Sequence, residues 1–320
     1  MSDSDSRFSL VAGEGDGTML GLAAGDSAGG AWELGYSAIT EQATVIAYQL
    51  IETGELETTH LVRSILELDG AEEEEPVYRA ETPHFRTWLG RAAAGGAVPE
   101  EEPSLDAAPR AVPLGVALRR DPSLLRETVV ELSRVFHSDL SSIVAGVVSA
   151  SATAASCFGQ SGRDLIAGVV ETVELTEAQV GSTLRYSGVS WDELAGDLRA
   201  LMDHVGVTDG EEALKTVGAD PEPGPWALMR AGLLLAAPPA DRSHIPIEQA
   251  ARIGGSTLGA VVGGIMGARI GIRAWPWAFA NDTWFAEIGR RLVRGPNEVG
   301  DLPIPYAVEQ HLISGERGFR

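Results

Sequence analysis

The chain has 320 residues, 44% hydrophobic and 6% aromatic, so it can build one large core or two modest domains. Its formal net charge of −22 at pH 7 repels phosphate backbones and anionic membranes, which argues against nucleic acid and membranes as partners. A single cysteine, Cys157, excludes an intrachain disulfide, and the opening residues MSDSDSRF do not resemble a signal peptide. We therefore expect a cytoplasmic protein.

A glycine repeat marks the first predicted helix, after an acidic lead-in at residues 1–14 that we expect to be disordered. Gly21, Gly25 and Gly29 recur every four residues in GTMLGLAAGDSAGGA. This spacing places them on one helical face, where a second helix can approach closely.

The next helix is predicted over 40–53, with Thr40 as its N-cap and Gly54 at its end. Apolar residues at helical spacing predict the remaining helices, separated by loops at 95–108 and 206–225. These helices cover residues 58–69, 83–94, 113–119, 122–136, 139–158, 162–172, 176–184, 191–205, 226–237, 247–252, 256–270 and 283–294.

No stretch shows the two-residue alternation that is typical of a half-buried strand. The run from Leu258 to Ile272 is shorter than the roughly 20 residues of a membrane span and is expected to be a buried helix. The sequence therefore predicts one all-α domain over 15–300, with about a dozen helices, followed by a tail at 301–320.

Six segments, in order, resemble the ADP-ribosylglycohydrolase family. They are GLAAGDSAGGAWE at the start, SAITEQATVIAYQL, PRAVPLG, VFHSDLSSIVAGVVSASA, GPWALMRA and GGSTLGAVVGGIMGA. The chain is identified as a member of this family, and the resemblance implies an all-α orthogonal bundle. It also implies an enzyme that cleaves the bond between ADP-ribose and a modified side chain with the help of two magnesium ions.

In the family, two motifs supply the carboxylates for these ions: Thr-Asp-Asp at one helix start and Asp-x-Asp-Thr at another. Here the first motif reads Thr40-Glu41-Gln42. The second, counted back from the later glycines, places Gly254 and Ser256 at the two Asp positions and Thr257 at the Thr position. One carboxylate of four remains, which is too few to neutralise two adjacent magnesium ions. We therefore expect no metal cofactor.

The resemblance and the residue types together give a set of candidate ligand-binding residues: Asp26, Glu33, Thr40, Glu41, Gln42, His137, Gly254, Gly255, Ser256 and Thr257. Asp26, His137 and the run from Gly254 to Thr257 carry open alternatives. Asp26 is also interpreted as a helix cap, and His137 as a hydrogen-bonded structural residue. The run from Gly254 to Thr257 is either an anion site at a helix start or a plain N-cap with a hydroxyl from Ser256 or Thr257.

The predicted function is that of a pseudoenzyme that binds an ADP-ribose-like or other small anionic ligand, or a protein partner. The alternative is a weak magnesium-dependent hydrolase that acts through Thr40, Glu41 and Thr257.

Overall fold

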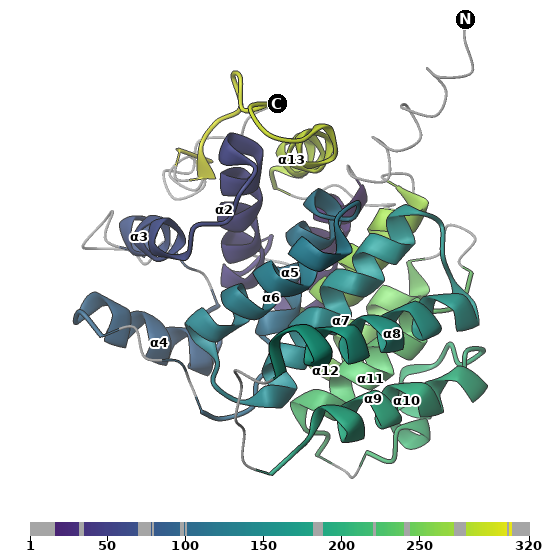
Figure 1. Ribbon diagram of the computed structural model, residues 1–320. Helices are drawn as coiled ribbons and strands as arrows, with labels where there is room; N and C mark the ends of the chain where they lie inside the picture. The colour runs from purple at the N-terminus through teal and green to yellow at the C-terminus, as the bar shows by residue number, and fades with distance from the viewer. Residues whose placement is uncertain are drawn as a thin grey trace, which may run out of the picture.

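The computed structural model describes residues 17–31, 35–69, 78, 80–96, 99, 101–181, 188–219, 222–239, 244–271, 280–305 and 307–308. Within these ranges all the regular elements are helices and no strand is present (Figure 1). The prediction of an all-α fold is confirmed. The predicted lead-in at 1–14 and residues 309–320 of the predicted tail lie outside the described residues.

Residues 17–26 are helical and run into the short π-helix η1 (Ser27–Ala31). The elements that follow are α2 (Ala38–Thr53), α3 (Thr58–Asp69), α4 (Pro83–Ala93), α5 (Ala107–Ala117), α6 (Pro122–Phe136), α7 (Leu140–Cys157), α8 (Gly162–Val180), α9 (Trp191–Ala200), η3 (Leu201–Asp203), α10 (Gly210–Thr216), α11 (Pro225–Ala236), α12 (Ile245–Ile270) and α13 (Asp282–Arg294).

The glycine face of helix 17–26 packs directly against a second glycine face on α12. A Cβ added at Gly25 would lie 1.9 Å from the Gly259 carbonyl oxygen, and one added at Gly263 would lie 2.0 Å from the Gly21 carbonyl oxygen. The two backbones therefore touch, as the four-residue glycine spacing predicts. The facing pairs are Gly17 with Gly267, Gly21 with Gly263, and Gly25 with Gly259.

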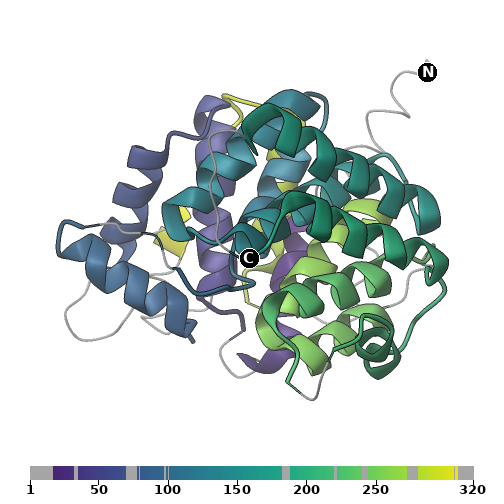
Figure 2. The ribbon, with the colours of Figure 1, turned by 60° about the horizontal axis from the view of Figure 1, so that its bottom comes forward.

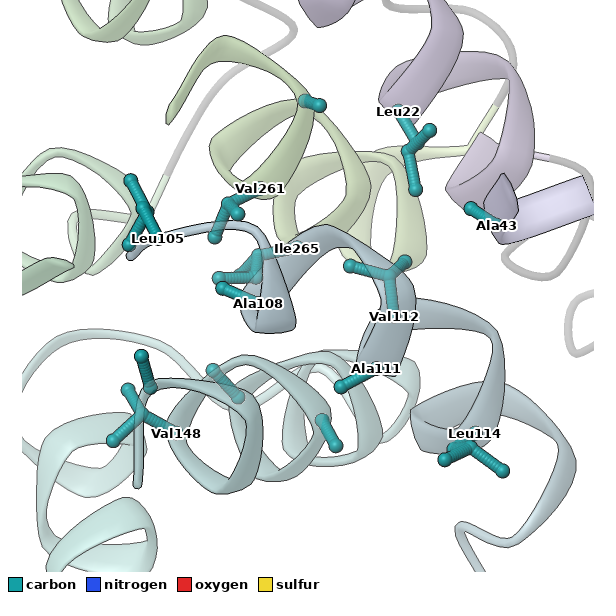
Figure 3. Close-up of a cluster of buried hydrophobic side chains, with 14 of the residues drawn as sticks. Leu22, Ala43, Leu105, Ala108, Ala111, Val112, Leu114, Val148, Val261 and Ile265 are labelled. Carbon is teal, nitrogen blue, oxygen red and sulfur yellow. The ribbon is translucent and has the colours of Figure 1, made fainter. Parts of the chain in front are cut away.

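Helix α5 forms the centre of the bundle, where every residue from Ala107 to Val116 is buried. It packs against α2, α6, α7, α12 and α13. Figure 3 shows Ala108 and Val112 of α5 beside Val261 and Ile265 of α12, with Leu22 and Ala43 close to Val112. A helix in this position can carry a polar side chain into the interior only if that side chain finds partners there.

The outer helices fall into two groups. In both views, α3 and α4 lie at one side of the molecule and the green helices α9 to α11 lie at the other (Figures 1 and 2). Helix α2 belongs to the first side, and its contacts with α5 and α12 connect it to the centre. The start of α2 is therefore the place where the glycine-paired helices, α5 and the first side of the bundle meet.

Two predicted helix starts are corrected. Helix α2 begins at Ala38 and its N-cap is Ser37, whose hydroxyl accepts from the Ile39 N–H, so Thr40 is not the cap. Helix α5 begins at Ala107 rather than at 113. Pro109 is tolerated in the first turn, where its missing N–H would have no intrahelical partner, and burial offsets the hydrogen bond lost at Pro113.

Three further predictions differ from the structure. The two helices predicted within 162–184 form the single helix α8, because Val169, Val173 and Thr176 continue one buried face. The short α10 lies in a predicted loop, capped by the Asp209 side chain. The helices predicted at 247–252 and 256–270 are joined in α12 across a kink at Gly255.

By length and hydropathy, α7 and α12 would each be able to cross a membrane. Their apolar windows are 89% and 61% buried inside the protein, and the core helices of soluble proteins have the same features. The prediction that the run after Leu258 forms a buried helix is confirmed, since residues 258–268 of α12 are all buried.

Candidate functional site

Asp26, at the end of helix 17–26, is fully buried and binds the start of α2. Ser37 donates its N–H to Asp26 Oδ2 and its hydroxyl to Oδ1, both at 2.8 Å. Thr40 donates its hydroxyl to Oδ2 at 2.7 Å. Burial raises the pKa of Asp26 above its ordinary value, and the hydrogen bonds from Thr40 and Ser37 oppose this rise. The carboxylate anchors the positive end of the α2 dipole, as the helix-cap interpretation requires.

The first turn of α2 carries Thr40, Glu41 and Gln42, and all three are buried. The Gln42 amide is held at both ends. Its Nε2 donates to the Ala38 carbonyl oxygen at 2.7 Å, and its Oε1 accepts from Arg110 Nε at 2.6 Å. Gln42 therefore fixes α2 to α5 through a charged donor, which makes this a strong hydrogen bond.

Arg110 brings a positive charge into the centre of the bundle. Its guanidinium lies over the Phe136 ring, 4.0 Å from the ring centroid, a distance typical of a cation–π contact. Burial lowers the pKa of Arg110 to about 10, while Asp106, one helical turn earlier, opposes this shift. A pKa of about 10 keeps the side chain charged at neutral pH. The charge is therefore stabilised by an aromatic ring and by polar neighbours.

His137, which ends α6, is the next partner of Arg110. Arg110 Nη1 lies 3.1 Å from His137 Nε2, and a guanidinium can only donate, so Nε2 accepts. Burial, followed by Arg110 and His84, lowers the pKa of His137 well below its ordinary value. The imidazole is therefore neutral at pH 7 with its hydrogen on Nδ1. Within the described part of the chain, this buried Nδ1 has no hydrogen-bond partner.

The kink in α12 brings the second family motif to the same place. Gly255 has φ 64° and ψ −160°, a conformation essentially restricted to glycine. Ser256 follows and donates its hydroxyl to the Asp26 carbonyl oxygen at 2.9 Å. Gly29 approaches so closely that an added Cβ would lie 2.1 Å from the Ser256 nitrogen. Ser256 thus contacts Asp26 and Gly29, whereas the neighbouring Thr257 hydroxyl makes no hydrogen bond with the described residues.

The structure therefore brings most of the candidate residues together. Hydrogen bonds connect Ser256 to Asp26 and Asp26 to Thr40, and Arg110 connects Gln42 to His137. Gly254, Gly255 and Thr257 flank Ser256, and Glu41 lies between Thr40 and Gln42. Glu33 lies outside the described residues. We call the candidate residues that the structure describes, together with Arg110 and Ser37, the α2 network.

A comparison with known protein families identifies the family to which the chain belongs. A sequence profile described as ADP-ribosylglycohydrolase matches residues 15–301. The chain belongs to the ADP-ribosylglycohydrolase family. A solved structure called an "ADP-ribosylglycohydrolase-related protein complex" is similar to it with a TM-score of 0.58 and 18% identity, over 89% of this chain and 99% of the other. At that identity the likeness shows a shared fold. A search of curated protein sequences found no match.

This ADP-ribosylglycohydrolase-family protein also has a cavity of about 730 Å³, within the range of about 300–1,000 Å³ that is typical of ligand sites. The starts of α7 and α11 meet there, and Ser138 on its wall directly follows His137. The lining residues are Glu101, Pro103, Ser138, Asp139, Leu140, Ser141, Val189, Leu194, Gly224, Pro225, Trp226 and Ala227.

Asp139 and Trp226 give this cavity its chemical character. Asp139 caps α7, accepting from the Ser142 N–H at 2.8 Å through Oδ1, while its Oδ2 is buried without a partner among the described residues. Trp226 is half-buried, and its indole nitrogen donates to Asp197 at 2.8 Å, which fixes the ring. The cavity therefore combines an unused acceptor with an aromatic wall.

Metal ligands are sparse in the part of the chain that the structure describes. No group of three or more His, Cys, Asp or Glu side chains in it could hold a metal ion. The position that aligns with the first Asp of the second family motif, Gly254, also lacks room for a side chain. A Cβ there would lie 2.6 Å from the Cβ of Leu258.

Sequence reasoning did not assign Arg110, Ser37 or Asp106 to the site. The signal for Arg110 is its position as a charged residue inside the apolar run PRAVPLGVAL, because a buried charge needs a partner. Ser37 carries the ordinary N-cap signal, three residues before Thr40, which the sequence predicts as the cap. Asp106 carried no signal, since it accepts from Thr82, which is distant in the sequence.

Proposed function

We propose that this member of the ADP-ribosylglycohydrolase family binds an ADP-ribose-like ligand without hydrolysing it, and that it does so in the cytoplasm. The observation that carries this proposal is the state of Gln42. Where the family has a carboxylate for magnesium, this chain has an amide that is already bound between the Arg110 guanidinium and the Ala38 carbonyl oxygen.

The described donor set does not fit a pair of magnesium ions. Magnesium requires an octahedron of oxygen ligands with near-ideal geometry, and two adjacent ions require several carboxylates. Both carboxylate oxygens of Asp26 already accept from Ser37 or Thr40. Gln42 Oε1 accepts from a cationic side chain, which would repel a metal ion bound to the same oxygen. No step of the proposal therefore involves a metal ion.

Groups of the α2 network and of the cavity with Trp226 suit a nucleotide ligand. Arg110 supplies the positive charge that a diphosphate needs within a strongly acidic protein. Thr257 is a half-buried residue with a hydroxyl at the α12 kink, and the buried Nδ1–H of His137 is a donor without a partner among the described residues. In the cavity that Ser138 lines, the Trp226 ring can stack on a base, and Asp139 Oδ2 can accept from ribose hydroxyls.

The test is a pair of calorimetric titrations of the purified chain, first with magnesium and then with ADP-ribose. We expect no saturable magnesium binding, and ADP-ribose binding with the same affinity in magnesium and in EDTA. Trp226→Ala is expected to weaken the binding about tenfold, since base stacking on an aromatic ring contributes about 1–3 kcal/mol. Thr257→Val should weaken it less. Thr87→Val, an exposed change on α4, is the control that should leave it unchanged.

Two other outcomes would replace the proposal. Tight magnesium binding, with release of ADP-ribose that Glu41→Ala abolishes, would support the weak hydrolase, which the burial of Glu41 in the first turn of α2 favours. The absence of binding by both probes would indicate a protein that acts through a protein partner, to be sought by affinity capture.

A further inference from the structure

A second cavity, of about 460 Å³, lies between α2 and α3 and is separate from the α2 network. One face of α2 supplies Val45, Tyr48, Gln49 and Glu52, at helical spacing. One face of α3 supplies His60, Ser64, Glu67 and Leu68, and the third wall is Ile304 and Pro305. We call this the α2–α3 pocket. Gln49 lies two turns of α2, or about 10 Å, beyond Gln42.

The pocket combines apolar residues with hydrogen-bond acceptors. Val45 and Leu68 are buried apolar residues at its base, while Ile304 is 48% exposed at its edge. Gln49 is only 5% exposed, and its Nε2 donates to the Glu57 carbonyl oxygen at 3.1 Å. Its Oε1 accepts no hydrogen bond from any described residue. A side-chain carbonyl oxygen that lines a cavity without a donor can accept a hydrogen bond from a ligand.

The charges around the pocket are negative. Glu52 and Glu67 are exposed at its mouth, and neither forms an ion pair with a described residue. None of the lining residues is Lys or Arg. Arg291, whose charge acts on the lining residue Tyr48, is already paired with Glu287 at 2.7 Å and Asp301 at 2.9 Å. Two carboxylates of opposite helices therefore line the pocket, and neither has an arginine or lysine partner among the described residues.

We propose that the α2–α3 pocket binds a small organic cation, with an ammonium or guanidinium group on an apolar body. The Glu52 and Glu67 carboxylates pair with the positive group, and Gln49 Oε1 accepts one of its N–H donors. The face of Tyr48 adds a cation–π surface, and Val45, Leu68 and Ile304 cover the apolar part of the ligand. This site is independent of the function proposed for the α2 network.

Equilibrium dialysis of the full chain against labelled tyramine and labelled agmatine tests the proposal. The comparison ligand is 3-(4-hydroxyphenyl)propionate, which carries a carboxylate in place of the tyramine ammonium. We expect at least one of the two cations to bind, the propionate not to bind, and the binding to weaken as salt screens the charges.

The decisive variant is the double substitution Glu52→Gln and Glu67→Gln, which should weaken cation binding about tenfold or more. Gln49→Met, which keeps the size of the side chain and removes the acceptor, should weaken it by a smaller factor. The matched control is Glu55→Gln with Glu171→Gln. This pair changes the net charge equally at exposed positions outside the pocket and should leave the binding unchanged.

The proposal is overturned if neither cation binds, if the propionate binds as well as tyramine, or if the Glu52→Gln, Glu67→Gln variant binds like the control variant. ADP-ribose titration of the same variants separates the two sites. It should be unaffected by the pocket substitutions, whether or not the function proposed for the α2 network is correct.

Discussion

Helix 17–26 is held in two different ways, along its length and at its end. Along its length, glycine meets glycine on α12, and the contact is made by backbone atoms alone. At its end, Asp26 enters a network of side chains that come from α2, α5, the end of α6 and the kink of α12. The first contact depends on the absence of side chains, and the second depends on their hydrogen-bonding groups.

This difference explains how the family's fold can persist while its chemistry changes. The glycine contact leaves no space for any substitution, so it fixes the distance between the two helices. The α2 network needs only that each donor meets an acceptor. Gln42 can therefore stand where the family has a carboxylate, because its amide oxygen satisfies Arg110 and its amide nitrogen satisfies Ala38.

The largest effect is expected from Gly25→Ala, which breaks the backbone contact. The new Cβ would lie 1.9 Å from the Gly259 carbonyl oxygen, so the helices must separate, at a cost of about 3 kcal/mol or more. Urea unfolding followed by circular dichroism measures the loss. Gly90→Ala is the control, since it is exposed on α4 with no atom near its Cβ, and it should stabilise the chain slightly. An equal effect of the two changes would contradict the glycine contact.

The next effect is expected from Asp26→Ala, which removes the acceptor of the network and leaves the glycine contact intact. The hydroxyls of Ser37 and Thr40 and the Ser37 N–H would stay buried without a partner, at a cost of about 2–3 kcal/mol. Urea unfolding measures this loss. Asp121→Ala, which removes the exposed N-cap side chain of α6, should cost only about 1 kcal/mol. A smaller loss for Asp26→Ala than for Asp121→Ala would show that the network does not stabilise the start of α2.

The two regions also differ in how far they could be predicted from the sequence. The glycine spacing predicted a close helix contact, because residues four apart share a face whatever the partner is. Most helices followed from apolar spacing for the same local reason. The start of α5 did not follow from this spacing, because two prolines, Pro109 and Pro113, argue against a helix there. Only burial on all sides offsets the hydrogen bond that is lost at Pro113.

The network was predictable only in part. The family resemblance selected Asp26, Thr40, Gln42, His137 and Ser256, but it did not give their partners. Gln42 meets a residue 68 positions away, and Asp26 meets one 230 positions away. Such pairs depend on how the helices pack, which no local pattern contains. Glu33 lies outside the described residues and stays a prediction.

Arg110→Met is expected to act on ligand binding more than on folding. The change leaves Gln42 Oε1 and His137 Nε2 without their donor but also removes a buried charge, so we expect a stability loss of only about 1–2 kcal/mol. ADP-ribose binding should weaken about tenfold or more, since the cation of the site is lost. Arg119→Met, which removes a buried arginine at the end of α5, should lower stability without this effect on binding. Equal binding by both variants would show that Arg110 does not meet the ligand.

The smallest effect is expected from the protonation of His137. Burial and Arg110 lower its pKa in the folded chain well below the ordinary value of 6.5, whereas the unfolded chain keeps that ordinary value. The unfolded state therefore binds a proton first as the pH falls. The contribution to the free energy of unfolding is complete above pH 6.5 and is lost below it, by at most about 1.4 kcal/mol for each pH unit.

His137→Gln should remove this contribution to the slope of unfolding free energy against pH between about pH 6.5 and 5, and it keeps an acceptor for Arg110. His204→Gln, a change at an exposed histidine, should leave the slope as it is. Parallel slopes for the wild type and His137→Gln would mean that His137 is protonated in the fold, and the tautomer deduced from the Arg110 contact would then be wrong.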